Sequence, residues 1–162
     1  MSAMTDRLLA GLVIVGAIGA GVIGGVFFAF SSFVMGALGR VPAREGVRAM
    51  QAINVVVLNP LFLGVFVGTA IVCAAAGAMA VWYGAAGRWW VVAGGGLYVV
   101  GTFGVTVACN VPLNDRLARV DADAPEAEGV WVDYQRRWAR WNHVRTAAAV
   151  GAMVAMILAI RM

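Results

Sequence analysis

The sequence predicts an all-α integral membrane protein, an up-and-down bundle of four helices that forms a single domain over residues 1–162. Composition is the first observation behind this prediction. Hydrophobic residues make up 62% of the chain, charged residues make up 12%, and the mean hydropathy is +0.87. A water-soluble domain of this size does not reach these values. The second observation is that the apolar residues gather in four long stretches, because about 20 apolar residues are needed to cross a bilayer as a helix.

The four expected spans cover about residues 8–38, 52–84, 89–113 and 144–160. In the first span, Gly16, Ala20 and Gly24 recur every four residues and predict a face for close helix packing. A short interfacial helix is expected over residues 43–50. In the second span, Pro60 follows Asn59, and we expect this proline to kink the helix axis.

A polar connection over residues 114–143 separates the third and fourth spans and contains the start of the fourth helix. Asp123 as N-cap and Pro125 in the first turn predict where that helix begins. The helical pattern then continues without a break into the apolar residues. We therefore expect a long fourth helix that projects beyond the bilayer at its N-terminal end.

Nearly all polar residues of the spans belong to one end of the predicted bundle. On the third helix they stand four residues apart and predict an inward-facing row, formed by Tyr98, Thr102, Thr106, Asn110 and Asn114. On the fourth helix one face carries Trp131, Tyr134, Gln135, Trp138, Asn142 and Arg145. Polar groups in a membrane are costly unless they face the bundle interior or a wet cavity. Their clustering therefore predicts a binding site at this end.

Twelve arginines and no lysine supply the positive charge of the chain. Nine of the arginines fall at or near the connections between spans one and two and between spans three and four, and three fall on the other side. By the positive-inside rule, the polar end is expected in the cytoplasm and both termini outside. No nucleic-acid-binding motif accompanies these charges, so a nucleic acid is not an expected partner.

Four sequence stretches carry a resemblance to a known family. They are GVFFAFSSFVMG (25–36), AMQAINVVVLNP (49–60), NVPLNDRLA (110–118) and RRWARWNHVRTAAA (136–149). Together they resemble the anthrone oxygenase family of small membrane proteins, in a match that covers all four helices. The resemblance implies a four-helix membrane fold and the oxygenation of an anthrone to an anthraquinone, with O2 as co-substrate and no evident cofactor. The bacterial inner (plasma) membrane is the expected location.

Chemistry assigns roles to the residues at the polar end. An anthrone loses a proton from its CH2 group to a modest base, and the electron-rich carbanion can reduce oxygen directly. His143 is the expected catalytic base and Asp115 its orienting partner. The expected substrate-binding residues are Asn54, Asn110, Asn114, Asn142, Trp138, Trp141, Tyr134 and Arg145.

Two alternatives stay open beside the oxygenase. One is a non-enzymatic membrane protein that binds or transports a quinone, a lipid or another small hydrophobic molecule. The other is a haem or metal enzyme that uses His143, although no metal site is predicted, because a lone histidine and one carboxylate make a poor zinc site. The expected partners are the lipid bilayer and a small hydrophobic aromatic ligand, and a homo-oligomer is left open.

Overall fold

Four helices in the computed structural model, which describes residues 2–162, are long and apolar enough to cross a membrane. They are Ala3–Leu38, Pro60–Trp82, Arg88–Ala118 and Ala127–Ile160. The predicted all-α membrane fold is therefore confirmed.

Two of these helices are composite. The first consists of α1 (Ala3–Ala29), the π-helical turn η1 (Phe30–Val34) and α2 (Met35–Leu38). After it come α3 (Ala43–Val56) and α4 (Pro60–Trp82). The other composite helix, which we call the third helix, consists of α5 (Arg88–Gly96), the π-helical segments η2 (Leu97–Gly104) and η3 (Thr106–Asn110), and α6 (Val111–Ala118). The chain ends in α7 (Ala127–Ile160), an uninterrupted helix of 34 residues that matches the long fourth helix expected from the sequence.

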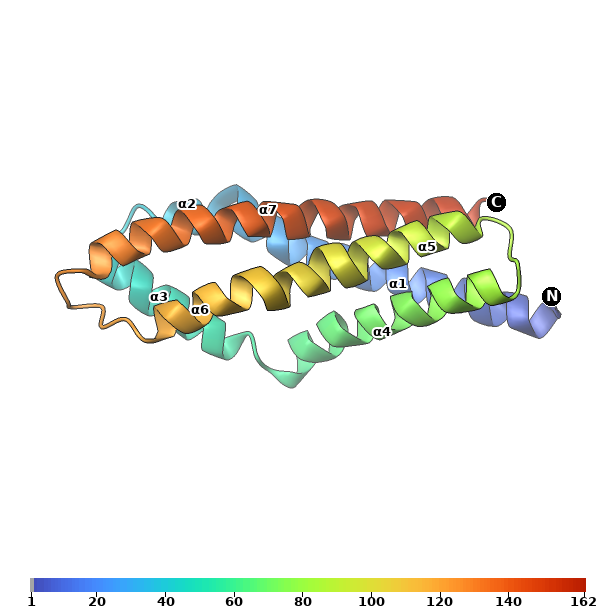
Figure 1. Ribbon diagram of the computed structural model, residues 1–162, viewed down its shortest axis with the longest axis horizontal. Helices are drawn as coiled ribbons and strands as arrows, with labels where there is room; N and C mark the ends of the chain where they lie inside the picture. The colour runs from blue at the N-terminus through green and yellow to red at the C-terminus, as the bar shows by residue number, and fades with distance from the viewer. Residues whose placement is uncertain (1) are drawn as a thin grey trace.

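Successive long helices run in alternate directions. Figure 1 shows both termini and the α4–α5 turn at one end of the bundle, and the α2–α3 turn and the α6–α7 loop at the other. α1 packs against α4 and α7, and α5 packs against the same two helices. This arrangement brings α3, α6 and the N-terminal half of α7 together at the end opposite the termini.

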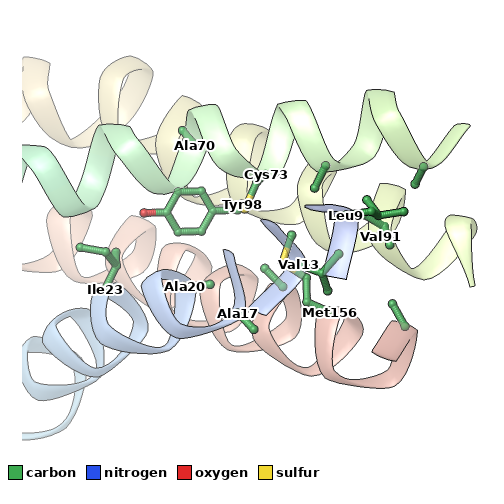
Figure 2. Close-up of a cluster of buried hydrophobic side chains, with 14 of the residues drawn as sticks. Leu9, Val13, Ala17, Ala20, Ile23, Ala70, Cys73, Val91, Tyr98 and Met156 are labelled. Atoms are coloured by element: carbon green, nitrogen blue, oxygen red, sulfur yellow. The ribbon is translucent and has the colours of Figure 1, made fainter. Parts of the chain in front are cut away.

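Small residues let the helices approach closely in the half of the bundle near the termini. Ala17, Ala20, Cys73 and Met156 are buried there in one cluster with Tyr98 (Figure 2). The Tyr98 hydroxyl donates a hydrogen bond of 3.1 Å to the Phe66 carbonyl and so links η2 to α4. The predicted packing face of the first helix is confirmed, since Gly16, Ala20 and Gly24 are all buried.

The second span is broken at Asn59 and Pro60, where we expected a kink in a continuous helix. The Asn59 side chain donates to the Val56 carbonyl at 2.9 Å and accepts from the Phe62 amide at 3.0 Å. It therefore satisfies backbone groups on both sides of the break, and Pro60 takes the first helical position, where no amide hydrogen is needed. Because of the break, α3 and α4 form a corner that stands away from α6 (Figure 1).

The third helix keeps its polar row on one face over a length that a regular α-helix would not allow. Residues four apart advance about 40° around an α-helix, so Tyr98 and Asn114 would differ in direction by roughly 160°. Tyr98, Thr102 and Asn110 are nonetheless all fully buried. The wider turns of η2 and η3, in which hydrogen bonds close on residue i+5, offset this rotation.

The start of α7 differs from the prediction that Asp123 is its N-cap. That prediction is wrong, because the helix begins at Ala127 with Glu126 as N-cap and without a side-chain capping bond. Asp123 instead forms an ion pair with Arg48 of α3. This ion pair links the α6–α7 loop to α3. The two residues are far apart in the chain, so no local sequence pattern predicts their contact.

Candidate functional site

A cavity of about 450 Å³ lies at the polar end of the bundle, between the end of α1, α3, the start of α4, the third helix and α7. Most of its wall is apolar. Aromatic side chains supply much of that wall, namely Phe27, Phe30, Phe62, Phe66, Phe103 and Trp138. The polar lining residues are Gln51, Asn54, Thr106, Asn114, Asp115 and Arg145. The volume and the aromatic walls suit a flat organic molecule of several rings.

The aromatic side chains form two groups. Phe66 lies against Phe103 with ring centroids 5.3 Å apart, and Phe62 stacks on Phe66 at 5.8 Å with 14° between the ring planes. Phe30 and Trp138 form the other group, with centroids 5.4 Å apart. The first group comes from α4 and η2, and the second from η1 and α7. Phe27 of α1 meets Phe66 edge-on, with centroids 6.3 Å apart, so aromatic side chains from five elements face a common space.

Arg145 brings a guanidinium group into this apolar environment, and the residue is only 4% exposed. The guanidinium carbon lies 4.0 Å from the centroid of the Phe27 ring and 5.0 Å from that of Trp138. Its terminal nitrogens donate to the Asn142 side-chain oxygen at 2.7 Å and to the Thr106 hydroxyl at 3.3 Å. Both acceptors are neutral, so the positive charge is held in place without a carboxylate contact from residues 2–162.

Asn142 fixes the position of Arg145 from behind the cavity wall. Its amide nitrogen donates at 2.8 Å to the Phe27 carbonyl and at 2.8 Å to the Ser31 hydroxyl, just where the first helix widens into η1. The side-chain oxygen of Asn142 is then directed at Arg145. Asn142 is fully buried, and it connects the first helix to α7 at the level of the site.

Asn114 organises another part of the cavity wall. Its side-chain oxygen accepts from the Tyr134 hydroxyl at 2.9 Å and from the Trp138 indole nitrogen at 2.9 Å. Asn110 lies one turn away, fully buried, and donates to the Trp138 carbonyl at 3.3 Å. Trp138 is thus held on both its backbone and its side chain by the polar row of the third helix.

α3 is fastened to the end of α6 by Gln51. The Gln51 amide nitrogen donates to the carbonyls of Leu117 and Val120, both at 2.9 Å. These bonds satisfy carbonyls at a helix end and place α3 beside the cavity. The other polar cavity residue of α3 is Asn54, whose amide nitrogen has no hydrogen-bond partner from Ser2 to Met162.

The structure brings together some of the predicted site residues. Asn54, Asn114, Asp115, Trp138 and Arg145 line the cavity. Tyr134, Asn110 and Asn142 lie behind its wall and act through the hydrogen bonds described above.

Two predicted site residues lie elsewhere. His143 and Trp141 are exposed on the outer surface of α7 and do not line the cavity. His143 and Asp115 are not joined by any hydrogen bond or ion pair within the part of the chain that the structure describes. Position explains this, since His143 is rotated by about 100° from the buried Asn142 around the helix. The roles assigned to the pair stay predictions.

The sequence reasoning missed the phenylalanine residues of the cavity and the part played by Thr106. It used polar residues as the signal for a site, and single phenylalanines in an apolar span carry no such signal. Only the break at Asn59 and Pro60 places Phe62 and Phe66 near the start of a helix at the cavity, and the sequence analysis expected a continuous span there.

Part of the cavity wall is exposed at the side of the bundle. Several of its lining residues are also exposed, at the α3–α4 corner and on the third helix, namely Val55, Leu58, Val67, Val107 and Val111. These five residues are apolar, whereas Asp115 of α6, also an exposed lining residue, is charged. The apolar part of this exposed wall would admit a hydrophobic molecule.

No group of three histidine, cysteine or acidic side chains suited to hold a metal ion occurs among the described residues. The prediction of a cofactor-independent reaction is not tested by this observation. It stays a prediction.

The fold and the cavity define a small helical membrane protein with an aromatic-walled cavity at one end of the bundle. The family model described as anthrone oxygenase matches residues 59–155, which is more than half of the chain, and the chain belongs to this family. The matched range includes α4, the third helix and Arg145, whereas α1 and α3 lie before it. No curated protein and no solved structure matches the chain.

Proposed function

We propose that the cavity takes up a flat phenolic or anthrone-like polycycle from the membrane and promotes its oxygenation by O2 without a resident cofactor. One observation carries this proposal. An aromatic-walled cavity of about 450 Å³ contains both a carboxylate, Asp115, and a buried guanidinium, Arg145. Family membership supports the choice of reaction.

The chemistry requires a base and a means of holding negative charge. The base removes a proton from the CH2 group of an anthrone, and the electron pair left behind is delocalised through the ring system onto the oxygen of the ketone, which gives an enolate. The enolate carbon gives its electrons to O2 and forms a carbon–oxygen bond, which yields a peroxide. Loss of water then breaks the O–O bond and leaves the carbonyl group of the anthraquinone. One O2 is consumed and one water is released for each anthrone.

Asp115 is the group that we assign as proton acceptor. It is the carboxylate among the cavity-lining residues, and it forms no ion pair with an arginine within residues 2–162. His143 receives no part in the reaction under this proposal, because it is not among the residues that line the cavity, whereas Asp115, although exposed, is.

The test is anthrone oxidation by the purified protein in lipid nanodiscs, followed as anthraquinone absorbance and O2 uptake after subtraction of the rate without protein. We expect Asp115→Asn to lower kcat at least tenfold, since general bases typically contribute about 10²–10⁴-fold. We expect His143→Ala to retain the parental rate. Glu128→Gln, which removes an exposed carboxylate of α7, is the matched control.

A parental rate in Asp115→Asn would contradict the assignment of the base, and a loss of activity in His143→Ala would restore the role predicted from the sequence. Binding of anthrone without turnover would favour the alternative of a carrier for hydrophobic molecules. A Soret band in the visible spectrum of the active protein would overturn the cofactor-independent reaction.

We also propose that the cavity end of the bundle faces the cytoplasm, with both termini outside the bacterial inner membrane. The arginine excess at this end supports the orientation. Arg145 has to be removed from that count, because it lies inside the bundle and not in a connection. The excess remains large without it.

A further inference from the structure

The charge of Arg145 lacks a counterion. Each ion pair found among residues 2–162 uses an arginine at the polar edge of the bundle, namely Arg48, Arg116, Arg136 or Arg137. Arg145 instead contacts two neutral oxygens and two aromatic rings. A buried charge is costly unless it is paired, and inside a membrane such a residue usually marks a functional site.

Two hydrogen-bond donors at the cavity are also unused. The Arg145 Nε atom and the Asn54 amide nitrogen are buried, and neither forms a hydrogen bond of normal geometry in the described part of the chain, although the Asn54 side chain lies close to the Tyr134 hydroxyl. Both residues line the cavity, one from α7 and the other from α3. Unpaired buried donors are rare in folded proteins, and each is expected to have a partner in the working state.

We infer that the cavity binds its ligand as an aromatic oxyanion, an enolate or phenolate, with the Arg145 guanidinium and the Asn54 amide donating to the negatively charged oxygen. The choice of a flat aromatic ligand in this inference rests on the proposed function. The binding of the ligand as an anion does not depend on the oxygenation reaction. The positions of Phe27 and Trp138 favour an oxyanion conjugated with a flat ring, because these side chains flank the guanidinium and would contact that ring. The only other charged residue in the cavity lining, Asp115 of α6, does not neutralise Arg145 by direct contact.

A physical consequence follows for any phenol that binds here. Donors aimed at the oxyanion stabilise the deprotonated ligand over the protonated one, so the ligand releases its proton at lower pH when bound than when free in lipid. The same preference would stabilise the enolate of an anthrone. Arg145 and Asn54 would then contribute to the rate by holding charge that develops at the oxygen, and the proton itself would leave through Asp115.

The experiment uses 2-hydroxyanthraquinone, whose colour changes on ionisation, bound to the protein in phosphatidylcholine nanodiscs. We expect the midpoint of its titration to lie lower in the parent protein than in empty nanodiscs. Arg145→Met should raise the midpoint by at least one pH unit, a tenfold change in the ionisation equilibrium, and Arg145→Lys should raise it less. Arg140→Met, which removes an exposed arginine of the same helix, is the matched control and should leave the midpoint unchanged.

Asn54→Leu provides the second variant, and it remains informative if Arg145→Met does not fold. It removes a donor that has no partner within residues 2–162, so the fold should persist and the midpoint should rise. A midpoint equal to the parental value in folded Asn54→Leu would overturn the shared role of the two donors. A midpoint that rises equally in Arg140→Met would overturn the site altogether.

Two further results separate this inference from the proposed reaction. If the probe ionises in an Arg145-dependent manner but anthrone is not oxidised, the anion site stands and the oxygenase proposal fails. If anthrone is oxidised and Arg145→Met has the parental rate, the reaction stands and the anion site fails. Binding of anthraquinone-2-carboxylate that depends on Arg145, with no effect on the phenol, would show that the site takes carboxylic acids and would overturn the aromatic oxyanion.

Discussion

At the scale of single residues, the cavity depends on side-chain amides that each contact more than one helix. Asn142 connects the first helix with α7 and directs its oxygen at Arg145. Asn114 accepts hydrogen bonds from Tyr134 and Trp138 of α7 with a single oxygen atom. Such bonds are costly to lose in an apolar environment, because the remaining donor finds no water to replace its partner. The amides therefore fix the shape of the cavity as well as its polarity.

Asn114→Leu and Asn110→Leu should differ for this reason. Asn114→Leu leaves two buried donors without an acceptor and should destabilise the protein by about 1–3 kcal/mol for each donor. Asn110→Leu removes one long bond of 3.3 Å together with an oxygen that has no partner among residues 2–162, so it should cost less than about 1.5 kcal/mol. Thermal unfolding in detergent, monitored by tryptophan fluorescence, measures both. Equal losses of stability would show that the Asn114 network adds nothing beyond an ordinary buried amide.

At the scale of elements, two departures from regular α-helix create the site. The break at Asn59 and Pro60 separates α3 from α4 and leaves room between their corner and the third helix. The π-helical segments η2 and η3 keep the polar row facing inward along the third helix. π-helical turns are uncommon and are found frequently at functional sites, and here all of them lie on the two helices that contact Arg145 through Phe27 and Thr106.

Close packing of the third helix against α7 gives an element-scale prediction. A Cβ atom added at Gly101 would lie 2.7 Å from the Ala148 Cβ atom, which has no rotamer that could move it away. Gly101→Ala should therefore push the helices apart and destabilise the protein by about 1–3 kcal/mol. Gly96→Ala is the control on the same composite helix, since nothing lies within 4 Å of its added Cβ atom.

The midpoint of thermal unfolding in detergent tests this pair. We expect it to fall in Gly101→Ala and to stay level or rise in Gly96→Ala, because alanine favours helix over glycine. If both variants unfold at the parental temperature, the contact between Gly101 and Ala148 does not limit the approach of the two helices.

At the scale of the whole molecule, polarity is divided between the two ends of the bundle. The end with the termini is packed with small apolar residues, and the opposite end holds the cavity, nine of the twelve arginines and the acidic partners of several of them. The unequal distribution of arginines supports the orientation that we propose, because the arginine-rich end of a membrane protein usually stays in the cytoplasm.

Cysteine labelling in intact cells tests the orientation. Ala86→Cys in the α4–α5 turn and Glu126→Cys before α7 place exposed thiols at opposite ends of the bundle. A membrane-impermeant maleimide should label Ala86→Cys from outside and should label Glu126→Cys only after the cells are opened. The parent protein is the control, since Cys73 is buried and Cys109 is half-buried. The reverse pattern would show that the arginines serve the site and do not report the topology.

The sequence by itself determined the membrane class, the four long helices and the inward faces of the third helix and α7. These features depend on hydropathy and on helical spacing, which are local properties of the chain. The burial of Tyr98, Thr102, Asn110, Asn142 and Arg145 agrees with those faces.

Only the tertiary structure decided which of the polar residues share one cavity. His143 was selected because it is the only histidine, but the rotation of α7 places it on the outer surface, beside a residue that is fully buried. Asn59 and Pro60 signal the helix break locally, but the size of the change in helix direction and the positions of the π-helical turns depend on packing between helices. The cavity and the unpaired charge of Arg145 follow from these changes, because both depend on contacts between residues far apart in the chain.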